Sequence, residues 1–285
     1  MIRTLPPIET LLEWALLEDL GDQDITSAAI SAQSKQAVGR CIIKDTGILA
    51  GVYWAKKVYG IIDKSVTIKE HLSDGDLCEM GNVAFEVYGN AYTLLVGERL
   101  VLNLLQRLSG IATLTRRYVE AVAGTPCEVL DTRKTTPLWR ALEKWAVQQG
   151  GGKNHRMGLY DQFLIKDNHI DLCGGVAQAI EAVLQFRLHH QKESPIVVEV
   201  RNLPEIAEAL QYANEIDRLL LDNFRPEQVA RAVEYIGGRL PVEVSGGITL
   251  ENARAYAEAG ARYLSAGSIT HSARSLDISL KILSI

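Results

Sequence analysis

A basic segment in the middle of an acidic chain holds the side chains best suited to chemistry. The 285-residue chain has a formal net charge of −5, yet residues 131–170 contain seven Lys or Arg against four Asp or Glu. The segment is short and is interrupted by apolar residues, so it does not suit a nucleic-acid-binding tract or a general solubility device. We interpret it as a pocket for a small polyanion.

Three of these cations follow apolar runs. Arg133 and Lys134 come directly after the run at 127–130, and Lys166 ends the run at 162–166. Short apolar runs bounded by polar residues are typical of β-strands. We therefore expect all three cations at the carboxyl ends of strands.

A glycine triplet at 150–152 lies between these two runs. Glycines expose backbone N–H groups without side-chain obstruction, and His155 and Arg156 follow closely, so the loop is suited to approach an anion. Unpaired cations at this density would repel one another. The side chains predicted to share an anionic ligand are Arg133, Lys134, His155, Arg156 and Lys166.

A helix is predicted between the two runs, over residues 138–149. Thr136 is its expected cap, and Leu138 belongs to its expected apolar face. Arg140 and Lys144 are expected on its solvent-exposed face.

After residue 126, short apolar runs alternate with helical segments, a pattern typical of a parallel sheet. The expected strands are 127–131, 162–166, 196–200, 218–222, 241–245 and 262–267. The expected helices are 138–149, 175–188, 204–213, 226–236, 250–259 and 272–283. We expect an α/β barrel, with an open doubly wound sheet as the alternative. The absence of GxGxxG after the first strand counts against a dinucleotide-binding fold.

The groups at the strand ends change along the chain. Cations come first, Glu199 and Asp222 follow, and Gly/Ser loops come last. In barrels the last two strands commonly hold a phosphate through backbone N–H groups. The loop residues are Ser245, Gly246, Gly247, Ala266, Gly267 and Ser268. The two carboxylates suit a Mg²⁺ ion that bridges substrate oxygens, and a salt bridge to Lys166 or Arg201 is the alternative.

The first part of the chain has a different pattern. Residues 7–17 are expected to form an amphipathic helix, and the short β-type runs within 37–89 indicate a small sheet-containing domain. Residues 91–123 form one long helical stretch, with a break expected at Ser109 and Gly110.

This long helix is apolar nearly all round, so we expect it to be buried on all sides, between domains or against another chain. Arg99 and Arg107 lie within it. Each should meet an anion, either a ligand or a carboxylate such as Glu98, and a buried structural ion pair is the alternative for both.

The overall composition is that of an ordinary globular protein, with 47% apolar and 23% charged residues. No long uncharged apolar run occurs, so we expect neither a membrane span nor a signal peptide and predict a cytoplasmic protein. The four cysteines form no CxxC pair, so we expect reduced, mostly buried thiols and no zinc site.

The chain resembles the quinolinate phosphoribosyltransferase family in a series of motifs that extends from EDLGDQDITS at its beginning to its last predicted helix. The motifs are ERLVLNLLQRLSGIAT, DTRKTTP, GGGKNHRMGLYD, LIKDNH, VEV, LLLDNF, VSGGI and AGSITHS. The pair GGGKNHRMGLYD and IKDNH is the most specific of them. One departure is TTPLWR, where Leu138 and Trp139 replace a glycine-containing turn that is common in the family, so the start of that helix is expected to differ.

The resemblance implies an α/β fold with an N-terminal α/β sandwich domain over 1–114 and an incomplete parallel α/β barrel over 115–285, whose last helix is a candidate to pack back on the first domain. It also implies a homodimer or an assembly of dimers with an active site shared between subunits, and neither nucleic acid nor membrane as a partner.

The implied reaction joins quinolinate and phosphoribosyl pyrophosphate, with Mg²⁺, to give nicotinate mononucleotide, pyrophosphate and CO₂. By resemblance, Lys134, Glu199 and Asp222 are catalytic, and the same two carboxylates surround the ribose and the metal. The quinolinate clamp is Arg133, His155, Arg156 and Lys166, with Thr132 among the substrate-binding residues. Arg99 would reach in from the partner, and the two Gly/Ser loops would hold the 5′-phosphate.

Two alternatives stay open at this point. One is a lyase that forms a Schiff base on a strand-end lysine, Lys166 or Lys134. The other is a non-catalytic, anion-binding relative, against which the retained His155 and Arg156 argue.

Overall fold

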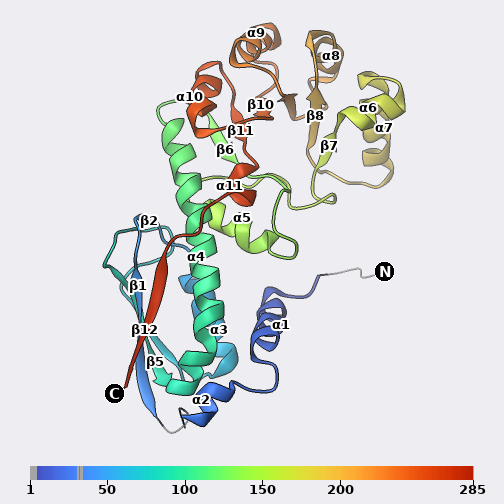
Figure 1. The fold of residues 1–285 in the computed structure, drawn as a ribbon. Coiled ribbons are helices and arrows are strands. Elements are labelled where there is room, and N and C mark those ends of the chain that lie inside the picture. The colour runs from blue at the N-terminus through green and yellow to red at the C-terminus, as the bar shows by residue number, and fades with distance from the viewer. Residues whose placement is uncertain (1–4, 31, 33–34, 285) are drawn as a thin grey trace. The chain divides into compact units, whose positions relative to one another are not determined.

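The chain, shown as a computed structural model in Figure 1, is described over residues 5–30, 32 and 35–284. It divides into two compact units. The N-terminal unit comprises Met1–Leu114, Ala141–Gly151 and Ala273–Ile285. The barrel unit comprises Thr115–Arg140 and Gly152–Ser272.

The N-terminal unit is built on an antiparallel sheet with the strand order β12-β1-β5-β3. Its strands are β1 (Gln36–Ile43), β3 (Thr67–Glu70), β5 (Val83–Asn90) and β12 (Ile278–Ser284), and a separate ribbon pairs β2 (Gly47–Ile48) with β4 (Leu77–Cys78). Its helices are α1 (Ile8–Leu20), α2 (Ile25–Ala29), α3 (Val52–Ile62), most of α4 (Ala91–Ala121) and most of α5 (Arg140–Gln149).

The predicted final helix over 272–283 is wrong, because its first half is irregular and its second half, residues 278–283, belongs to strand β12. It pairs with β1 along a continuous antiparallel register from Ile43↔Ile278 to Ala37↔Ser284. The free edge of β1 offers a ladder of backbone hydrogen bonds, and β-branched residues such as Ile278 and Ile282 suit a strand. Tertiary pairing therefore overrides the local helical pattern.

Helix α4 is continuous through Ser109 and Gly110, so the predicted break is wrong. The Ser109 hydroxyl is buried and bonds to the backbone of Ala50, and a Cβ at Gly110 would lie 2.1 Å from the carbonyl oxygen of Arg274. These small residues therefore allow close packing. Within one chain α4 is also not buried on all sides, since Arg99 and Asn103 are exposed; its burial against a second chain stays a prediction.

Helix α5 begins at Arg140, two residues later than predicted. Leu138 is 61% exposed with φ of 66°, so it belongs to a turn and not to the apolar face of the helix. Lys144 is fully buried, against the expectation of a solvent-exposed side chain, and Arg140 is half-buried. The helix is buried over most of its circumference because it lies inside the N-terminal unit.

The barrel unit contains six parallel strands in the order β6-β11-β10-β9-β8-β7, which confirms the expected strands and the incomplete parallel barrel. They are β6 (Glu128–Leu130), β7 (Phe163–Ile165), β8 (Ile196–Val200), β9 (Arg218–Asp222), β10 (Val242–Ser245) and β11 (Tyr263–Ser265). Among the described residues β6 and β7 do not pair, so the barrel stays open between them. Every position of β8 is buried, as expected for a strand covered on both faces.

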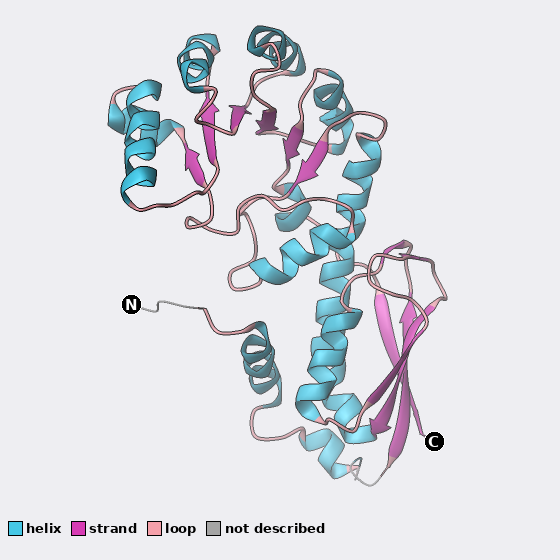
Figure 2. Ribbon diagram, turned by 180° about the vertical axis from the view of Figure 1, so that it is seen from behind, coloured by secondary structure: helices cyan, strands magenta, loops and turns pink. Residues whose placement is uncertain are grey.

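Helices lie on the outer side of this curved sheet (Figure 2). They are α6 (Asp167–Cys173), α7 (Val176–His189), α8 (Leu203–Ala209), the 3₁₀ turn η2 (Leu210–Tyr212), α9 (Pro226–Ile236) and α10 (Leu250–Glu258). The short helix α11 (Ser268–His271) instead follows the carboxyl end of β11. Alternating strands and helices in this order bring all six carboxyl ends of the strands to one face.

The predicted free thiols are confirmed, and Cys173 alone of the four cysteines is exposed. None of the helices in the described part of the chain has the length and apolar character needed to cross a membrane.

Candidate active site

A cavity of about 720 Å³ opens at the carboxyl ends of the barrel strands, entirely within the barrel unit. Every residue proposed for the site from the sequence lines it, with the exception of Arg99. These residues are Thr132, Arg133, Lys134, His155, Arg156, Lys166, Glu199, Asp222, Ser245, Gly246, Gly247, Ala266, Gly267 and Ser268.

The two arginines of α4 have different environments. Arg107 donates to Glu143 at 2.9 Å, so its predicted anionic partner is a buried carboxylate of the same unit. Arg99 is exposed and forms no ion pair with any described residue of this chain. The anion expected for Arg99 is therefore not supplied by the described part of this chain.

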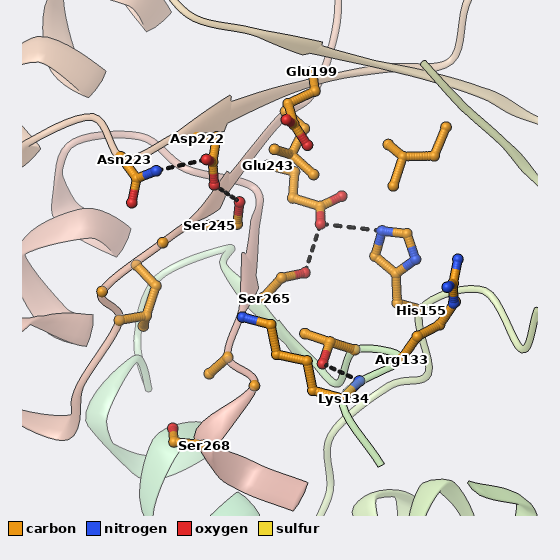
Figure 3. A pocket seen from close by; sticks show the side chains of 18 of the residues that line it. Arg133, Lys134, His155, Glu199, Asp222, Asn223, Glu243, Ser245, Ser265 and Ser268 are labelled. Carbon is orange, nitrogen blue, oxygen red and sulfur yellow. Dashed lines mark hydrogen bonds and ion pairs between the residues drawn. The ribbon is translucent and has the colours of Figure 1, made fainter. Parts of the chain in front are cut away.

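Arg133 and Lys134 lie on the loop that follows β6, with both side chains exposed to the cavity. The Lys134 N–H donates to Thr132 Oγ1 at 3.0 Å, and the Thr270 hydroxyl donates to the Lys134 carbonyl at 2.7 Å. A Cβ at Gly267 would lie 2.8 Å from the Lys134 side chain. The lysine stem thus runs over a glycine of the last loop, which places its amine beside that loop (Figure 3).

His155 and Arg156 lie on an irregular segment that returns to β6. The His155 N–H donates to Asp131 Oδ1 at 2.8 Å, and Lys153 forms a parallel bridge with Leu130. The glycine triplet itself does not line the cavity, against expectation. It follows the end of α5, and Gly151 adopts φ of 89°, which glycine adopts without strain.

The pKa of Arg156 is shifted below its ordinary value. Burial is the largest cause and the nearby charge of Arg133 the second, while Asp161 and Glu199 act in the opposite direction. Both main causes disfavour the charged form of the Arg156 guanidinium. An anion bound next to Arg156 would favour the charged form and would itself be attracted by it. The proximity of Arg133 and Arg156 therefore supports the predicted anion site.

Glu199 is buried near the end of β8 and accepts a hydrogen bond from Lys166 Nζ at 2.9 Å. The salt bridge considered from the sequence therefore exists for Lys166. Arg201 instead pairs with Glu205 and Asp171.

Asp222 ends β9 and is held by two short hydrogen bonds. Its Oδ1 accepts from the Ser245 hydroxyl and its Oδ2 from the Asn223 amide, both at 2.6 Å. Asn223 has φ of 59°, and a Cβ at Gly246 would lie 2.1 Å from the Asn223 side-chain oxygen. The glycine is required here because the adjacent loops approach closely.

Glu199 and Asp222 are oxygen donors of the kind that Mg²⁺ prefers. Among the described residues no group of three or more His, Cys, Asp or Glu is placed to hold a metal. Mg²⁺ is commonly held by one or two carboxylates together with substrate phosphates, and the donor set fits that mode better than a closed protein cage.

The two Gly/Ser loops are joined by a side chain that sequence reasoning missed. Tyr118, buried on the last turns of α4 within the barrel unit, places its hydroxyl 2.9 Å from Ser268 Oγ and 3.3 Å from the Ile248 carbonyl. It therefore connects the loop after β10 with the start of α11.

Glu243 is the second residue that was missed. It is fully buried in β10 and accepts from Arg218 at 2.7 Å and Ser265 at 2.5 Å, with His155 Nε2 at 3.2 Å (Figure 3). Burial acts to raise its pKa, but His155, Arg218 and Ser265 together lower the pKa below its ordinary value. The one sequence indication was a carboxylate in the middle of an apolar strand.

An incomplete α/β barrel whose strand ends carry cations, carboxylates and glycine loops defines a class of proteins that bind small polyanionic substrates. Residues 24–109 match the N-terminal domain of quinolinate phosphoribosyl transferase, and residues 111–281 match its C-terminal domain. The chain therefore belongs to the quinolinate phosphoribosyl transferase family.

Similar proteins span nearly the whole chain. It is 41% identical to the probable nicotinate-nucleotide pyrophosphorylase [carboxylating] of Bacillus subtilis (strain 168), over 96% of this chain and 93% of that protein. It is 39% identical to quinolinate phosphoribosyltransferase [decarboxylating] 2a, mitochondrial, of Nicotiana tabacum, over 96% of this chain and 82% of the relative. The crystal structure of NadC from Streptococcus pyogenes superposes with a TM-score of 0.90 at 38% identity, covering 99% of each chain.

Proposed function

We propose that this chain transfers the phosphoribosyl group of phosphoribosyl pyrophosphate to quinolinate and releases pyrophosphate and CO₂, giving nicotinate mononucleotide for NAD biosynthesis. One observation carries the proposal beyond family membership. The cavity brings together a group of cations, two carboxylates and two glycine loops at one face of the barrel unit. This cation group consists of Arg133, Lys134, Arg156 and Lys166. These groups match the carboxylates, the ribose and the phosphates of the two substrates.

Quinolinate carries two carboxylates on adjacent ring carbons. Arg133, Arg156 and Lys166 supply cationic donors around one part of the cavity, and guanidinium groups bind carboxylates with two parallel hydrogen bonds. Lys166 already donates to Glu199, so a bound carboxylate would share that amine with the protein. The substrate ring is thereby oriented with its nitrogen toward the sugar.

The sugar donor fits the other part of the cavity. The loops that begin at Ser245 and Ala266 offer backbone N–H groups for a 5′-phosphate. Glu199 and Asp222 would face the ribose, where carboxylates stabilise the positive charge that develops on the sugar as the pyrophosphate departs. Lys134 lies near these loops and would neutralise charge on the leaving group.

Glu199 and Asp222 are also the residues that would hold Mg²⁺, which when bound neutralises the charge of the pyrophosphate. After transfer of the phosphoribosyl group the pyridinium nitrogen carries a positive charge. The C–C bond to the adjacent carboxylate then breaks and CO₂ leaves. The electron pair stays on the ring carbon next to the cationic nitrogen, and this carbon takes up a proton from solvent. The cation group holds the carboxylate that remains.

Substrate selectivity tests this proposal. Purified protein should form the mononucleotide from quinolinate and phosphoribosyl pyrophosphate, and should turn over nicotinate poorly because a substrate with one carboxylate leaves part of the cation group without a partner, at a cost of about 1–3 kcal/mol. Equal turnover of nicotinate would contradict the substrate assignment. Borohydride with a ketose, which would trap a Schiff base on Lys134 or Lys166, should leave the protein mass unchanged.

We further propose a homodimer, or an assembly of dimers, in which Arg99 completes the site of the neighbouring subunit. The support is that Arg99 is exposed and has no ion pair with described residues of its own chain. Location in the cytoplasm also stays a prediction.

Mixing inactive variants tests the shared site. Arg99→Ala and Lys134→Ala should each be nearly inactive. After subunit exchange, about half of the dimers are mixed and each has one intact site of two, so about a quarter of wild-type activity should return. Mass spectrometry confirms the exchange. If exchange occurs without recovery, Arg99 does not act in the neighbouring subunit.

A further inference from the structure

Glu243 stands at the centre of a buried polar network that the reaction as described does not use. Both of its carboxylate oxygens are engaged. Oε2 accepts from Arg218, and Oε1 faces both the Ser265 hydroxyl and His155 Nε2 (Figure 3). A fully buried carboxylate is costly unless such partners are in place, so its position in β10 needs an explanation.

The hydrogen bonds of His155 specify one tautomer of its ring. The backbone N–H of Arg156 donates to His155 Nδ1 at 2.7 Å, so Nδ1 acts as an acceptor and carries no proton. Nε2 faces the Glu243 carboxylate, which only accepts, so Nε2 carries the proton. This pattern of contacts is the one that a neutral ring with its proton on Nε2 makes.

The same contacts fix the backbone of Arg156. This residue lies outside any helix or strand, and regular backbone hydrogen bonds do not hold it. The N–H of His155 donates to Asp131, and the N–H of Arg156 donates to the imidazole. The next two N–H groups, of Met157 and Gly158, donate to Asp161. The imidazole is in turn oriented by Glu243.

We propose that Glu243 is a positioning residue, which holds His155 as the neutral Nε2–H tautomer and, through that ring, fixes the backbone from which Arg156 reaches the substrate carboxylates. The proposal rests on the proposed function only for the identity of the substrate. It assigns the binding charge to the arginines and lysines, and it makes His155 a neutral spacer between β10 and the Arg156 loop and not a cation that binds a carboxylate.

The first test needs no variant. Nitrogen-15 NMR of the free wild-type protein with labelled histidine, with the His155 signal assigned by comparison with His155→Gln, reports which ring nitrogen is protonated. At neutral pH we expect a protonated Nε2 and an unprotonated Nδ1. A doubly protonated ring, or a proton on Nδ1, would overturn the proposal.

The second test is Glu243→Gln, which keeps the size of the side chain. Arg218 can only donate, so the amide oxygen must face Arg218 and the amide NH₂ must face Ser265 and His155. His155 Nε2 then has to accept, which moves the ring proton to Nδ1 and against the Arg156 N–H. We expect the tautomer signal to change and the KM for quinolinate to rise about 10-fold to 100-fold, with the KM for phosphoribosyl pyrophosphate unchanged.

Arg218→Gln is the matched control, because it breaks the same ion pair and leaves Glu243 free to accept from His155. It should reduce thermal stability as Glu243→Gln does, while the His155 tautomer and the quinolinate KM stay as in the wild type. Equal increases in the quinolinate KM for both variants would mean that the ion pair alone matters, and the positioning role would be lost.

The two proposals fail in different ways. If the wild-type protein does not turn over quinolinate, the proposed function fails, whereas the tautomer of His155 can still be measured and still tests the Glu243 contact. If turnover is normal and Glu243→Gln keeps both the tautomer and the quinolinate KM, only the positioning role fails.

Discussion

Two buried Arg–Glu pairs, one in each unit, have similar geometry and different surroundings. In the N-terminal unit Arg107 lies 2.9 Å from Glu143, and in the barrel unit Arg218 lies 2.7 Å from Glu243. Both glutamate side chains are completely buried. The pairing alone therefore does not distinguish a structural role from a functional one.

The remaining hydrogen bonds separate the two pairs. Arg107 uses Nε and Nη2 on one oxygen of Glu143 and Nη1 on the Ala273 carbonyl, so these contacts brace α4, α5 and the segment that leads to β12. Glu243 instead directs its second oxygen to Ser265 and His155, which line the cavity. The difference lies in the carboxylate oxygen that the arginine does not use. In Glu243 this oxygen contacts residues that line the cavity, so this ion pair can position cavity side chains.

The largest effect that would test this comparison is the loss of stability in Glu143→Ala. Removing one partner leaves the Arg107 guanidinium without its carboxylate, which should lower the free energy of unfolding by about 3–5 kcal/mol. Urea unfolding measures the loss, and the KM values of the remaining folded enzyme should not change. Glu258→Ala, which removes an exposed partner of Arg254, is the control and should cost less than about 1 kcal/mol. A similarly small cost for Glu143→Ala would mean that the pair does not brace the unit.

Arg156→Ala tests the cavity residue that the Arg218–Glu243 pair is proposed to position through His155. Losing a charge-assisted contact of about 1.5–3 kcal/mol should raise the KM for quinolinate about 10-fold to 100-fold, with little change in unfolding free energy. Arg201→Ala, which removes an arginine that pairs outside the cavity, should leave that KM unchanged. If instead the KM for phosphoribosyl pyrophosphate rises most, the positions assigned to the two substrates are exchanged.

Tyr118→Phe tests an uncharged contact of the same cavity, for comparison with the two ion pairs. It removes the hydroxyl between Ile248 and Ser268, worth about 0.5–1.5 kcal/mol, so the KM for phosphoribosyl pyrophosphate should rise a few-fold while that for quinolinate is unchanged. Steady-state kinetics with each substrate varied in turn measures both. An effect confined to quinolinate would show that these loops do not hold the sugar phosphate.

The smallest effect concerns pH. The pKa of Glu243 is lower in the folded protein than its ordinary value of 4.5, so the stabilisation it gives is fully present above that value and is lost as the pH falls through the folded pKa. The difference in unfolding free energy between wild type and Glu243→Gln should thus stay constant from neutral pH to about 4.5 and narrow below it. A difference that narrows well above this range would contradict the lowered pKa.

Errors in the sequence predictions occur where distant parts of the chain decide the local structure. The segment ISLKILS has apolar spacing compatible with a helix, and only the free edge of β1 makes it a strand. Lys144 has the spacing of a solvent-exposed residue and is buried because α5 lies inside the N-terminal unit. In both cases the part of the chain that decides the local structure is far away in the sequence.

The sequence by itself determined the parallel strands and most of the cavity. Each cation, carboxylate or glycine loop follows directly after its own strand, and parallel strands present their carboxyl ends on one face whatever their order. Only the tertiary structure decided which of these groups support one another. Glu243 on β10 meets His155 on the irregular segment after α5, and Tyr118 on α4 meets Ser268 on α11, although both pairs are distant in the chain. Such contacts depend on strand order and side-chain direction, which no local pattern of residues encodes.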